Sequence, residues 1–211
     1  MTDHQTLTLQ EIRIALEGNT LLELDARIAP GEVLTVMGPS GSGKSTLLAL
    51  VAGFLAPAFH ASGKVMLDGR DITGLPAEQR GIGLLFQDPL LFPHLSVAGN
   101  LRFGLPRATP EKSGHVERAL EQIGLAGFSD RDPATLSGGQ QSRVALMRLL
   151  LSAPRAVLLD EPFSKLDTHL RREMRHLVFE RLREAGLPSL LVTHDHHDAE
   201  AAGGRVIELT H

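Results

Sequence analysis

The chain contains no cysteine, no tryptophan and no tyrosine among its 211 residues. Without cysteine, disulfides and thiolate metal sites are excluded. The longest uncharged apolar stretch, residues 47–59, is interrupted by Pro57 and is shorter than the roughly 18 residues that a membrane-spanning helix needs. Positive charge does not dominate, since 21 lysines and arginines face 25 aspartates and glutamates, for a net charge of −4. The composition therefore offers no overall basic field for nucleic acid or an anionic membrane.

The N-terminal residues also lack the basic opening and apolar run of a secretory signal. We expect the chain to stay inside the cell and to reach a membrane only through a partner. With 42% hydrophobic and 22% charged residues, the chain has the composition of a typical globular protein. Its length suits one compact domain with an attached subdomain.

Short apolar runs predict an α/β fold. Residues 7–37 hold three such runs broken by turn residues, a pattern typical of tightly joined strands. A helical pattern begins at Lys44, and another covers residues 167–185. Further strand patterns lie at 81–86, 156–160, 189–193 and 205–209. Alternation of strands and helices in the C-terminal part predicts βαβ units and a mostly parallel sheet, preceded by an N-terminal antiparallel β subdomain.

Residues 88–153 differ from the rest, because they hold helical patterns at 110–124 and 139–152 but no convincing strand. We predict one domain over residues 1–211. In it, an α/β core of residues 1–87 and 154–211 carries an inserted helical subdomain of residues 88–153.

The octet GPSGSGKS at residues 38–45 fits G-x-x-x-x-G-K-[ST] between a strand and a helix pattern. Its glycines allow backbone N–H groups to wrap phosphates, Lys44 can reach the β and γ oxygens, and Ser45 offers a hydroxyl to Mg²⁺. The alternative is a glycine-rich turn that caps a helix. The residues predicted to bind the phosphates are Gly38, Pro39, Ser40, Gly41, Ser42, Gly43, Lys44, Ser45 and Thr46.

Two carboxylates follow the apolar strand pattern at 156–160. Asp160 and Glu161 would emerge at the carboxyl edge of the sheet, where ligands bind in open α/β folds. We predict that Asp160 supports Mg²⁺ and that Glu161 deprotonates the attacking water. The alternative is a solvated turn that happens to carry two acids.

A second anion-binding terminus is indicated by LSGGQ at residues 136–140, where a serine and two glycines open a helix pattern. Ser137 and the N–H groups of Gly138 and Gly139 could bind a phosphate, with Gln140 beside them. By itself the pattern is equally that of a flexible turn with an N-capping serine.

Six motifs occur together in one order: GPSGSGKST, LLFQD, LSGGQ, VLLDEP, SKLD and VTHD. Over nearly its whole length the chain thus resembles the ATP-binding subunit of an ABC transporter. The resemblance implies ATP and Mg²⁺ as ligands and a head-to-tail homodimer. In that dimer each ATP is held between one phosphate loop and the partner's LSGGQ, so hydrolysis reopens the dimer.

The resemblance also assigns roles to single residues. It places Gln87 beside Mg²⁺ and the attacking water, His194 against the γ-phosphate and Glu161, and Asp167 in a dimer-contact loop. The catalytic set is then Glu161, His194, Lys44 and Gln87, and the metal set is Ser45, Gln87 and Asp160. Alternatives are a buried structural amide for Gln87, a helix cap for Asp167, and a divalent metal bound by His194, His197 and Asp198.

Residues 87–103 have the sequence QDPLLFPHLSVAGNLRF and resemble the surface that receives a helix of a membrane permease. This sequence is most similar to that of importers. A satellite core under a loop is the alternative. The function implied is an ATPase that powers solute import from the cytoplasmic side of the inner membrane. It would dock on permease subunits that work with a solute-binding protein, and we expect no nucleic acid as partner.

Two other functions stay open at this point. One is a soluble ABC-type mechanical ATPase acting on nucleic acid or ribosomes, although the chain lacks the long coiled-coil insertions of such proteins. The other is a simple P-loop kinase, which would leave LSGGQ unexplained. The family usually stacks adenine on an aromatic residue some two dozen positions before the phosphate loop, where this chain offers only Leu16, and Ser142 stands where many relatives carry glutamine.

Overall fold

A computed structural model of the chain describes residues 5–209, and these form two compact units. The first unit contains residues 5–84, 155–161 and 175–209, and the second contains residues 85–154 and 162–174. Within residues 5–209, no helix combines the length and apolarity needed to cross a membrane.

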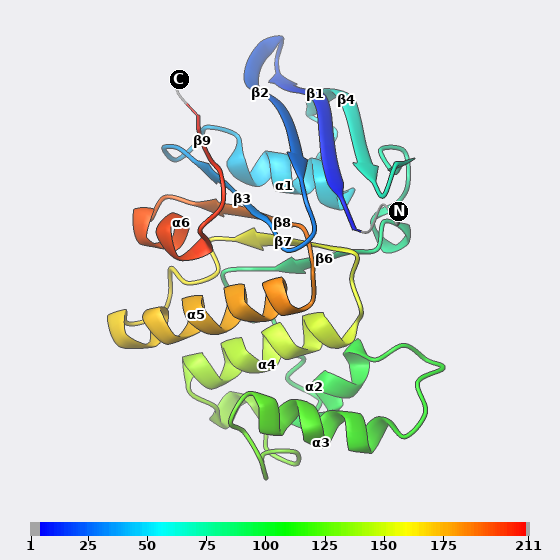
Figure 1. Cartoon of the computed structure of the whole chain (residues 1–211), viewed down its shortest axis with the longest axis vertical. Coiled ribbons are helices and arrows are strands. Elements are labelled where there is room, and N and C mark those ends of the chain that lie inside the picture. Colours follow the sequence, from blue (N-terminus) through cyan, green and yellow to red (C-terminus); the bar gives the residue numbers. More distant parts are fainter. Residues whose placement is uncertain (1–4, 210–211) are drawn as a thin grey trace. The chain divides into compact units, whose positions relative to one another are not determined.

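The first unit is built on a five-stranded sheet in the order β6-β7-β8-β3-β9 (Figure 1). Strand β3 pairs in parallel with β8 and β9, and β7 pairs in parallel with β8. Every residue of β3 and β8 is buried, which explains why their sequences are mostly apolar rather than alternating. The strands are β3 (Val33–Met37), β6 (Ile82–Leu85), β7 (Ala156–Asp160), β8 (Ser189–Thr193) and β9 (Val206–Glu208).

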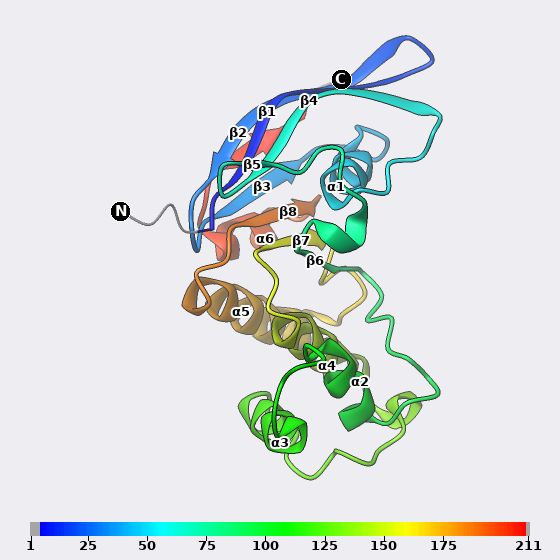
Figure 2. The ribbon, with the colours of Figure 1, turned by 90° about the vertical axis from the view of Figure 1, so that its right-hand side faces the viewer.

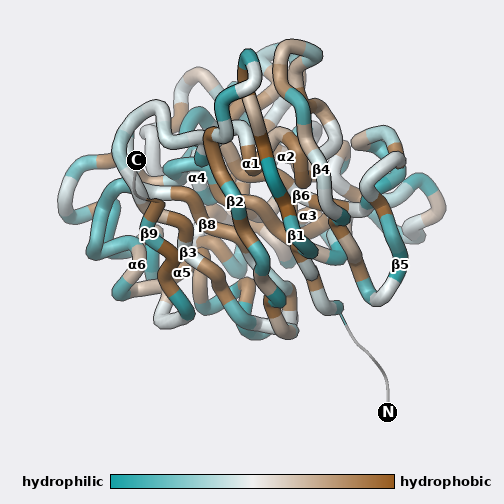
Figure 3. Tube along the Cα trace, turned by 90° about the horizontal axis from the view of Figure 1, so that it is seen from above, coloured by the Kyte–Doolittle hydropathy of each residue, from teal (hydrophilic) through white to brown (hydrophobic). Residues whose placement is uncertain are grey.

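A second sheet in this unit is antiparallel, with the order β2-β1-β4-β5. Buried and exposed residues alternate along β1 and β2, and Figure 3 shows the matching alternation of hydrophobic and hydrophilic residues. This period of two buries one face of the sheet and leaves the other in solvent. The strands are β1 (Leu7–Leu16), β2 (Asn19–Ile28), β4 (Phe59–Leu67) and β5 (Arg70–Asp71).

Helix α1 (Lys44–Ala52) lies between the two sheets (Figure 2). Its side chains Leu47, Leu48 and Val51 join the inner faces of both sheets in one hydrophobic core. The phosphate loop is therefore anchored at its helical end by apolar burial on two sides. A 3-10 turn at Ala77–Gln79 and helix α6 (His196–Ala202) complete the unit.

The second unit is helical. Helices α2 (Val97–Gly104), α3 (Lys112–Gln122) and α4 (Gly138–Leu151) pack around their own apolar core, and a 3-10 turn at Pro133–Thr135 precedes α4. Helix α5 (Thr168–Glu184) starts in this unit and ends in the first.

The α/β class, with a parallel sheet and a separate antiparallel sheet, is confirmed. Strand β4 and helix α2 were not predicted, and neither were the two-residue strand β5 and the two 3-10 turns. Strand β4 has five consecutive exposed residues, so it carries no apolar alternation and forms by pairing with β1. Helix α2 has only eight residues, two of them glycine, too few for a clear helical period.

Candidate active site

Three neighbouring strands of the parallel sheet end in register. Met37 of β3 pairs with Thr193 of β8, and Asp160 of β7 pairs with Val192. The residues that follow these strands, Gly38, Glu161 and His194, therefore meet at one edge. This is the carboxyl edge, where open α/β sheets bind ligands.

The phosphate loop has the geometry of an anion cradle. Gly41 and Gly43 have φ of 86° and 85°, left-handed values that favour glycine. No side chain caps α1, so the N–H groups of its first turn are left for an external acceptor. Within the described residues the hydroxyl of Ser42 is buried without a hydrogen-bond partner, as expected of a group that awaits a ligand.

Lys44 is held by its own loop. Its ammonium donates to the carbonyl oxygens of Gly38 and Pro39, both at 2.8 Å. Because an ammonium has three donors, one remains for a phosphate oxygen. The loop thus positions the positive charge before any anion binds.

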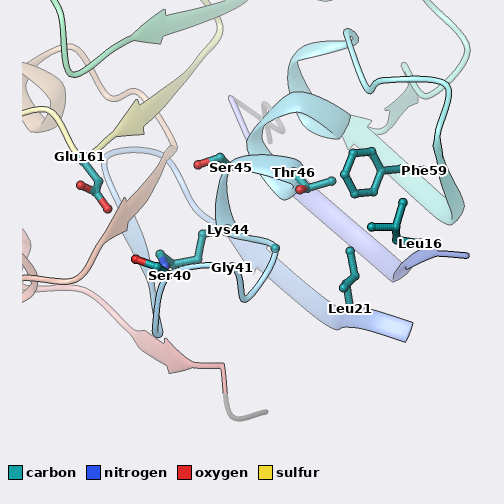
Figure 4. Close-up of a pocket in the computed structure, with 10 residues that line it drawn as sticks. Leu16, Leu21, Ser40, Gly41, Lys44, Ser45, Thr46, Phe59 and Glu161 are labelled. Carbon is teal, nitrogen blue, oxygen red and sulfur yellow. The ribbon is translucent and has the colours of Figure 1, made fainter. Parts of the chain in front are cut away.

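A cavity of about 390 Å³ opens over this loop (Figure 4). One end is polar and contains Lys44, Ser45 and Glu161, whereas the other is apolar. A nucleoside triphosphate divides in the same way, into a charged chain and a flat base. The lining residues are Leu16, Leu21, Ser40, Gly41, Gly43, Lys44, Ser45, Thr46, Phe59 and Glu161.

Asp160 and Ser45 fit a magnesium ion. The Ser45 hydroxyl donates to Asp160 Oδ1 at 3.5 Å. Burial, and then the neighbouring charge of Glu161, raise the pKa of Asp160 above its ordinary value. A cation would relieve both effects, because it offsets the lost hydration and the like charge. One carboxylate and one hydroxyl also suit Mg²⁺, which keeps waters and takes its other ligands from phosphates.

Glu161 has a strained backbone and is held by hydrogen bonds. It has φ of 44°, a conformation that side chains other than glycine rarely adopt and that often marks functional positions. Its N–H donates to Val192 O at 2.9 Å, and its carboxylate Oε1 lies 3.0 Å from His194 Nδ1. A protonated Nδ1 would donate to that oxygen. The pairing of Glu161 with His194 is the contact that the sequence predicted.

An arginine of α5 holds the segment around His194, through Asp195 directly and through Asp198 to Thr193. Arg175 donates to Asp195 Oδ2 at 2.6 Å and also to the carboxylate of Asp198. The second Asp198 oxygen accepts from the Thr193 hydroxyl at 2.7 Å. Asp198 is 3% exposed, so this network is buried and rigid. Since Asp198 is engaged here, it does not join His194 and His197 as the predicted alternative metal ligand.

The LSGGQ segment of the second unit forms the capped N-terminus of helix α4. Ser137 Oγ accepts from Gln140 N–H at 3.3 Å, and Gln140 Oε1 accepts from Ser137 N–H at 3.0 Å, which makes a capping box. A Cβ on Gly139 would come within 2.5 Å of Leu170, whereas one on Gly138 meets no heavy atom of this unit within 4 Å. The Ser142 hydroxyl donates to Gly138 O at 3.0 Å, so this departure from the family pattern is accommodated inside α4.

Gln87 and Asp167 also lie in the second unit. Gln87 is exposed after β6, which argues against a buried structural amide. Asp167 Oδ1 accepts from the N–H groups of His169 and Leu170, both at 3.1 Å, so it caps α5 as the alternative interpretation had it. Their roles toward the nucleotide stay predictions.

Sequence analysis missed two residues of the first unit. Phe59 lines the apolar end of the cavity, but it lies in the unpredicted strand β4. Arg175 gave no signal, because its partners are defined only by the packing of α5 against residues 193–198. The sequence offered one hint of this role, namely that Phe59 is an aromatic residue shortly after the helix predicted from Lys44.

The loop, the strand-end carboxylates and the histidine at one sheet edge define the class, a P-loop nucleoside triphosphatase. Residues 21–164 match the family described as ABC transporter. The chain belongs to the ABC transporter family, as an ATP-binding subunit whose ATPase activity is coupled to transport.

Relatives that align over most of this chain are also named as ATP-binding proteins of transport systems. The chain is 46% identical over 187 residues to the uncharacterized ABC transporter ATP-binding protein YnjD of Escherichia coli, covering 88% of this chain and 86% of that protein. It is 46% identical over 206 residues to the thiamine import ATP-binding protein ThiQ of Jannaschia sp., with coverage of 96% and 88%. To the Fe(3+) ions import ATP-binding protein FbpC of Pasteurella multocida it is 41% identical over 211 residues, covering 98% of this chain and 60% of that protein.

Replacing Asp160 with asparagine should stabilise the nucleotide-free protein at neutral pH. The raised pKa of Asp160 means that its ionised form is disfavoured in the folded state, and the amide removes that charge. The gain in melting temperature should be present at neutral pH and disappear as pH falls and Asp160 becomes protonated. Mg²⁺-dependent hydrolysis should drop at least about 100-fold. Melting curves between pH 4 and 8, with ATPase assays, test both; an Asp160→Asn protein less stable than wild type at pH 7 would contradict the charge argument.

Substitution of Arg175 should slow hydrolysis without weakening ATP binding. We expect Arg175→Met to lower kcat about 10-fold or more with little change in KM, because the phosphate loop is intact while His194 loses its anchor. Arg175→Lys should recover part of the rate, since it keeps the charge but not the two-pronged contact.

Arg183→Met is the matched control. Arg183 also joins α5 to α6, through the carbonyls of Ala201 and Ala202, but does not contact residues 193–198. Equal losses of kcat in the two methionine variants, measured on folded protein, would mean that Arg175 acts only through general stability.

Proposed function

We propose that two copies of this chain close head to tail on ATP and Mg²⁺ and thereby power uptake of a solute through a membrane permease. Support for import comes from relatives named for import of thiamine, Fe(3+) ions and spermidine or putrescine. The subunit would work as a peripheral protein on the cytoplasmic face of the cell membrane. A solute-binding protein would deliver the cargo, and the relatives differ too much in cargo to assign one.

The open flank of Gly138 is the observation that carries the dimer. No neighbour in its own unit requires a glycine there, and the capping box leaves the remaining first-turn N–H groups of α4 unused. A phosphate brought by another molecule would find space, donors and the positive end of a helix dipole. This suits an ATP held by the phosphate loop of a partner.

In the proposed reaction, Lys44 and the loop amides neutralise the phosphates while Glu161 takes a proton from the attacking water. His194 holds the Glu161 carboxylate in place, and Arg175 holds the backbone around His194. Ser45 and Asp160 would hold Mg²⁺, which supplies further charge neutralisation at the β and γ oxygens. Release of the γ-phosphate removes the shared ligand, so the dimer reopens.

The permease surface would be formed by residues 87–103, which are held on a rigid support. Asn100, fully buried, accepts from Phe92 N–H at 2.8 Å and donates back to Phe92 O at 3.1 Å. Arg148 donates to the carbonyls of Leu90 and Pro89 at 2.9 and 3.1 Å. This support leaves Leu90, in the loop before α2, 56% exposed and Phe103, in α2, 65% exposed, an unusual position for large apolar side chains on a rigid support.

Glu161→Gln should trap the ATP-bound dimer, because the amide cannot act as a base but leaves the binding groups intact. In excess Mg-ATP we expect light scattering to give twice the monomer mass of 22.8 kDa. Adding Gly138→Asp should return the protein to the monomer without lowering its melting temperature, since a carboxylate suits a helix N-terminus but repels phosphate. Ser142→Ala is the control on the same helix and should leave the dimer intact. A monomeric Glu161→Gln protein in excess Mg-ATP would count heavily against the proposal.

Leu90→Ser combined with Phe103→Ser should uncouple the subunit from its permease. We expect the exposed Leu90→Ser to change stability by at most about 0.5 kcal/mol. Phe103→Ser should cost about 0.5 to 1.5 kcal/mol, because the Phe103 ring packs against Phe92. ATP binding should be normal. Tagged Glu161→Gln protein, purified from its host in mild detergent with Mg-ATP, should carry a polytopic membrane protein that the double serine variant loses.

Phe54→Ser, at a residue that is 52% exposed in the first unit, is the control and should retain that protein. Capture of only soluble or nucleic-acid-bound partners would favour the mechanical ATPase instead.

A further inference from the structure

The apolar end of the cavity is formed by three side chains from the antiparallel sheet. Leu16 lies on β1, Leu21 on β2 and Phe59 on β4. Phe59 is the one aromatic residue among the lining residues that the structure describes. Figure 4 shows its ring beside Thr46 and near Leu16, away from Ser40 and Glu161 at the polar end.

Strand register places these side chains. Leu16 pairs with Phe59 across β1 and β4, so the two residues are direct neighbours at the end of the sheet. A turn in which Phe59 N–H donates to Ala56 O at 3.0 Å starts β4 at this position. Phe59 is half-buried and packs against the main apolar core of the unit, which fixes it as part of the cavity wall.

The apolar end is also close to the phosphate loop. A Cβ built on Gly43 would lie 3.7 Å from Cβ of Leu21 and 3.6 Å from Cβ of Leu22. Strand β2 therefore passes directly against the loop that starts α1. Thr46, one position after Ser45, lies between the polar and apolar ends in Figure 4.

We infer that Phe59 binds the base of the nucleotide by stacking, supported by Leu16 and Leu21. This inference rests on the proposed nucleotide site and adds the residue that holds the base. An aromatic ring binds a flat base through its face, and Phe59 supplies this from β4, on the C-terminal side of the phosphate loop. Since Leu16, Leu21 and Phe59 carry no hydrogen-bonding group in their side chains, they recognise any purine alike.

The test compares nucleotides with a probe that has no base. Titration calorimetry would measure binding of ATP, GTP and inorganic tripolyphosphate, each with Mg²⁺. For Phe59→Leu we expect Kd for ATP and for GTP to rise together by about 3- to 10-fold, with Kd for tripolyphosphate unchanged. Phe59→Tyr, which keeps the ring, should match wild type. Phe54→Leu, a change at an exposed phenylalanine that does not line the cavity, should also match it.

Unchanged ATP affinity in Phe59→Leu would overturn the inference while leaving the nucleotide site standing. So would an equal loss of tripolyphosphate affinity, because the substitution would then have disturbed the loop rather than the base contact. Failure of the wild-type protein to bind either ATP or tripolyphosphate would overturn the proposed function together with this inference.

Discussion

The common register of β7, β8 and β3 is the constraint on which the site depends. Pairing of Asp160 with Val192 and of Met37 with Thr193 delivers a loop, a carboxylate and a histidine to one edge from three distant parts of the sequence. A shift of one residue in either pairing would turn the side chains to the opposite face of the sheet. The strands β3 and β8 are fully buried and mostly apolar where they pair, so burial of hydrocarbon contributes to fixing the register, and the polar residues at the strand ends follow from it.

That edge concentrates charge which the protein only partly compensates. Burial of Asp160, and then the charge of the adjacent Glu161 carboxylate, raise the pKa of Asp160. The Lys44 ammonium donates to carbonyl oxygens of its own loop, and Arg175 donates to the carboxylates of Asp195 and Asp198. The first unit is thus electrostatically incomplete at the place where a metal and phosphates would bind. Such local instability, together with the strained backbone of Glu161, is typical of a site shaped for a ligand rather than for stability.

The residues that could be predicted from the sequence are those whose structural context lies close by along the chain. The loop of residues 38–46 could be predicted because its glycines, lysine and serine act within one turn between a strand and a helix. Asp160 and Glu161 could be placed because a strand ends just before them. Phe59 could not, because its position depends on pairing with a strand more than forty residues earlier, and neither could Arg175, whose role comes from the packing of two helices. Helix α2 was missed because it has only eight residues, two of them glycine, so its buried apolar residues show no clear helical period in the sequence.

Glycine placement separates what the fold needs from what the function needs. Gly139 is crowded within its own unit, because a Cβ there would displace the side chain of Leu170, whereas nothing in that unit restricts Gly138. The phosphate loop shows the complementary case, in which left-handed backbone at Gly41 and Gly43 opens amides toward a ligand. A helix terminus with an internal capping box and an open glycine is stable without any anion. The LSGGQ segment can therefore stay folded without a bound phosphate, which is the property that the proposed closing and reopening dimer would need.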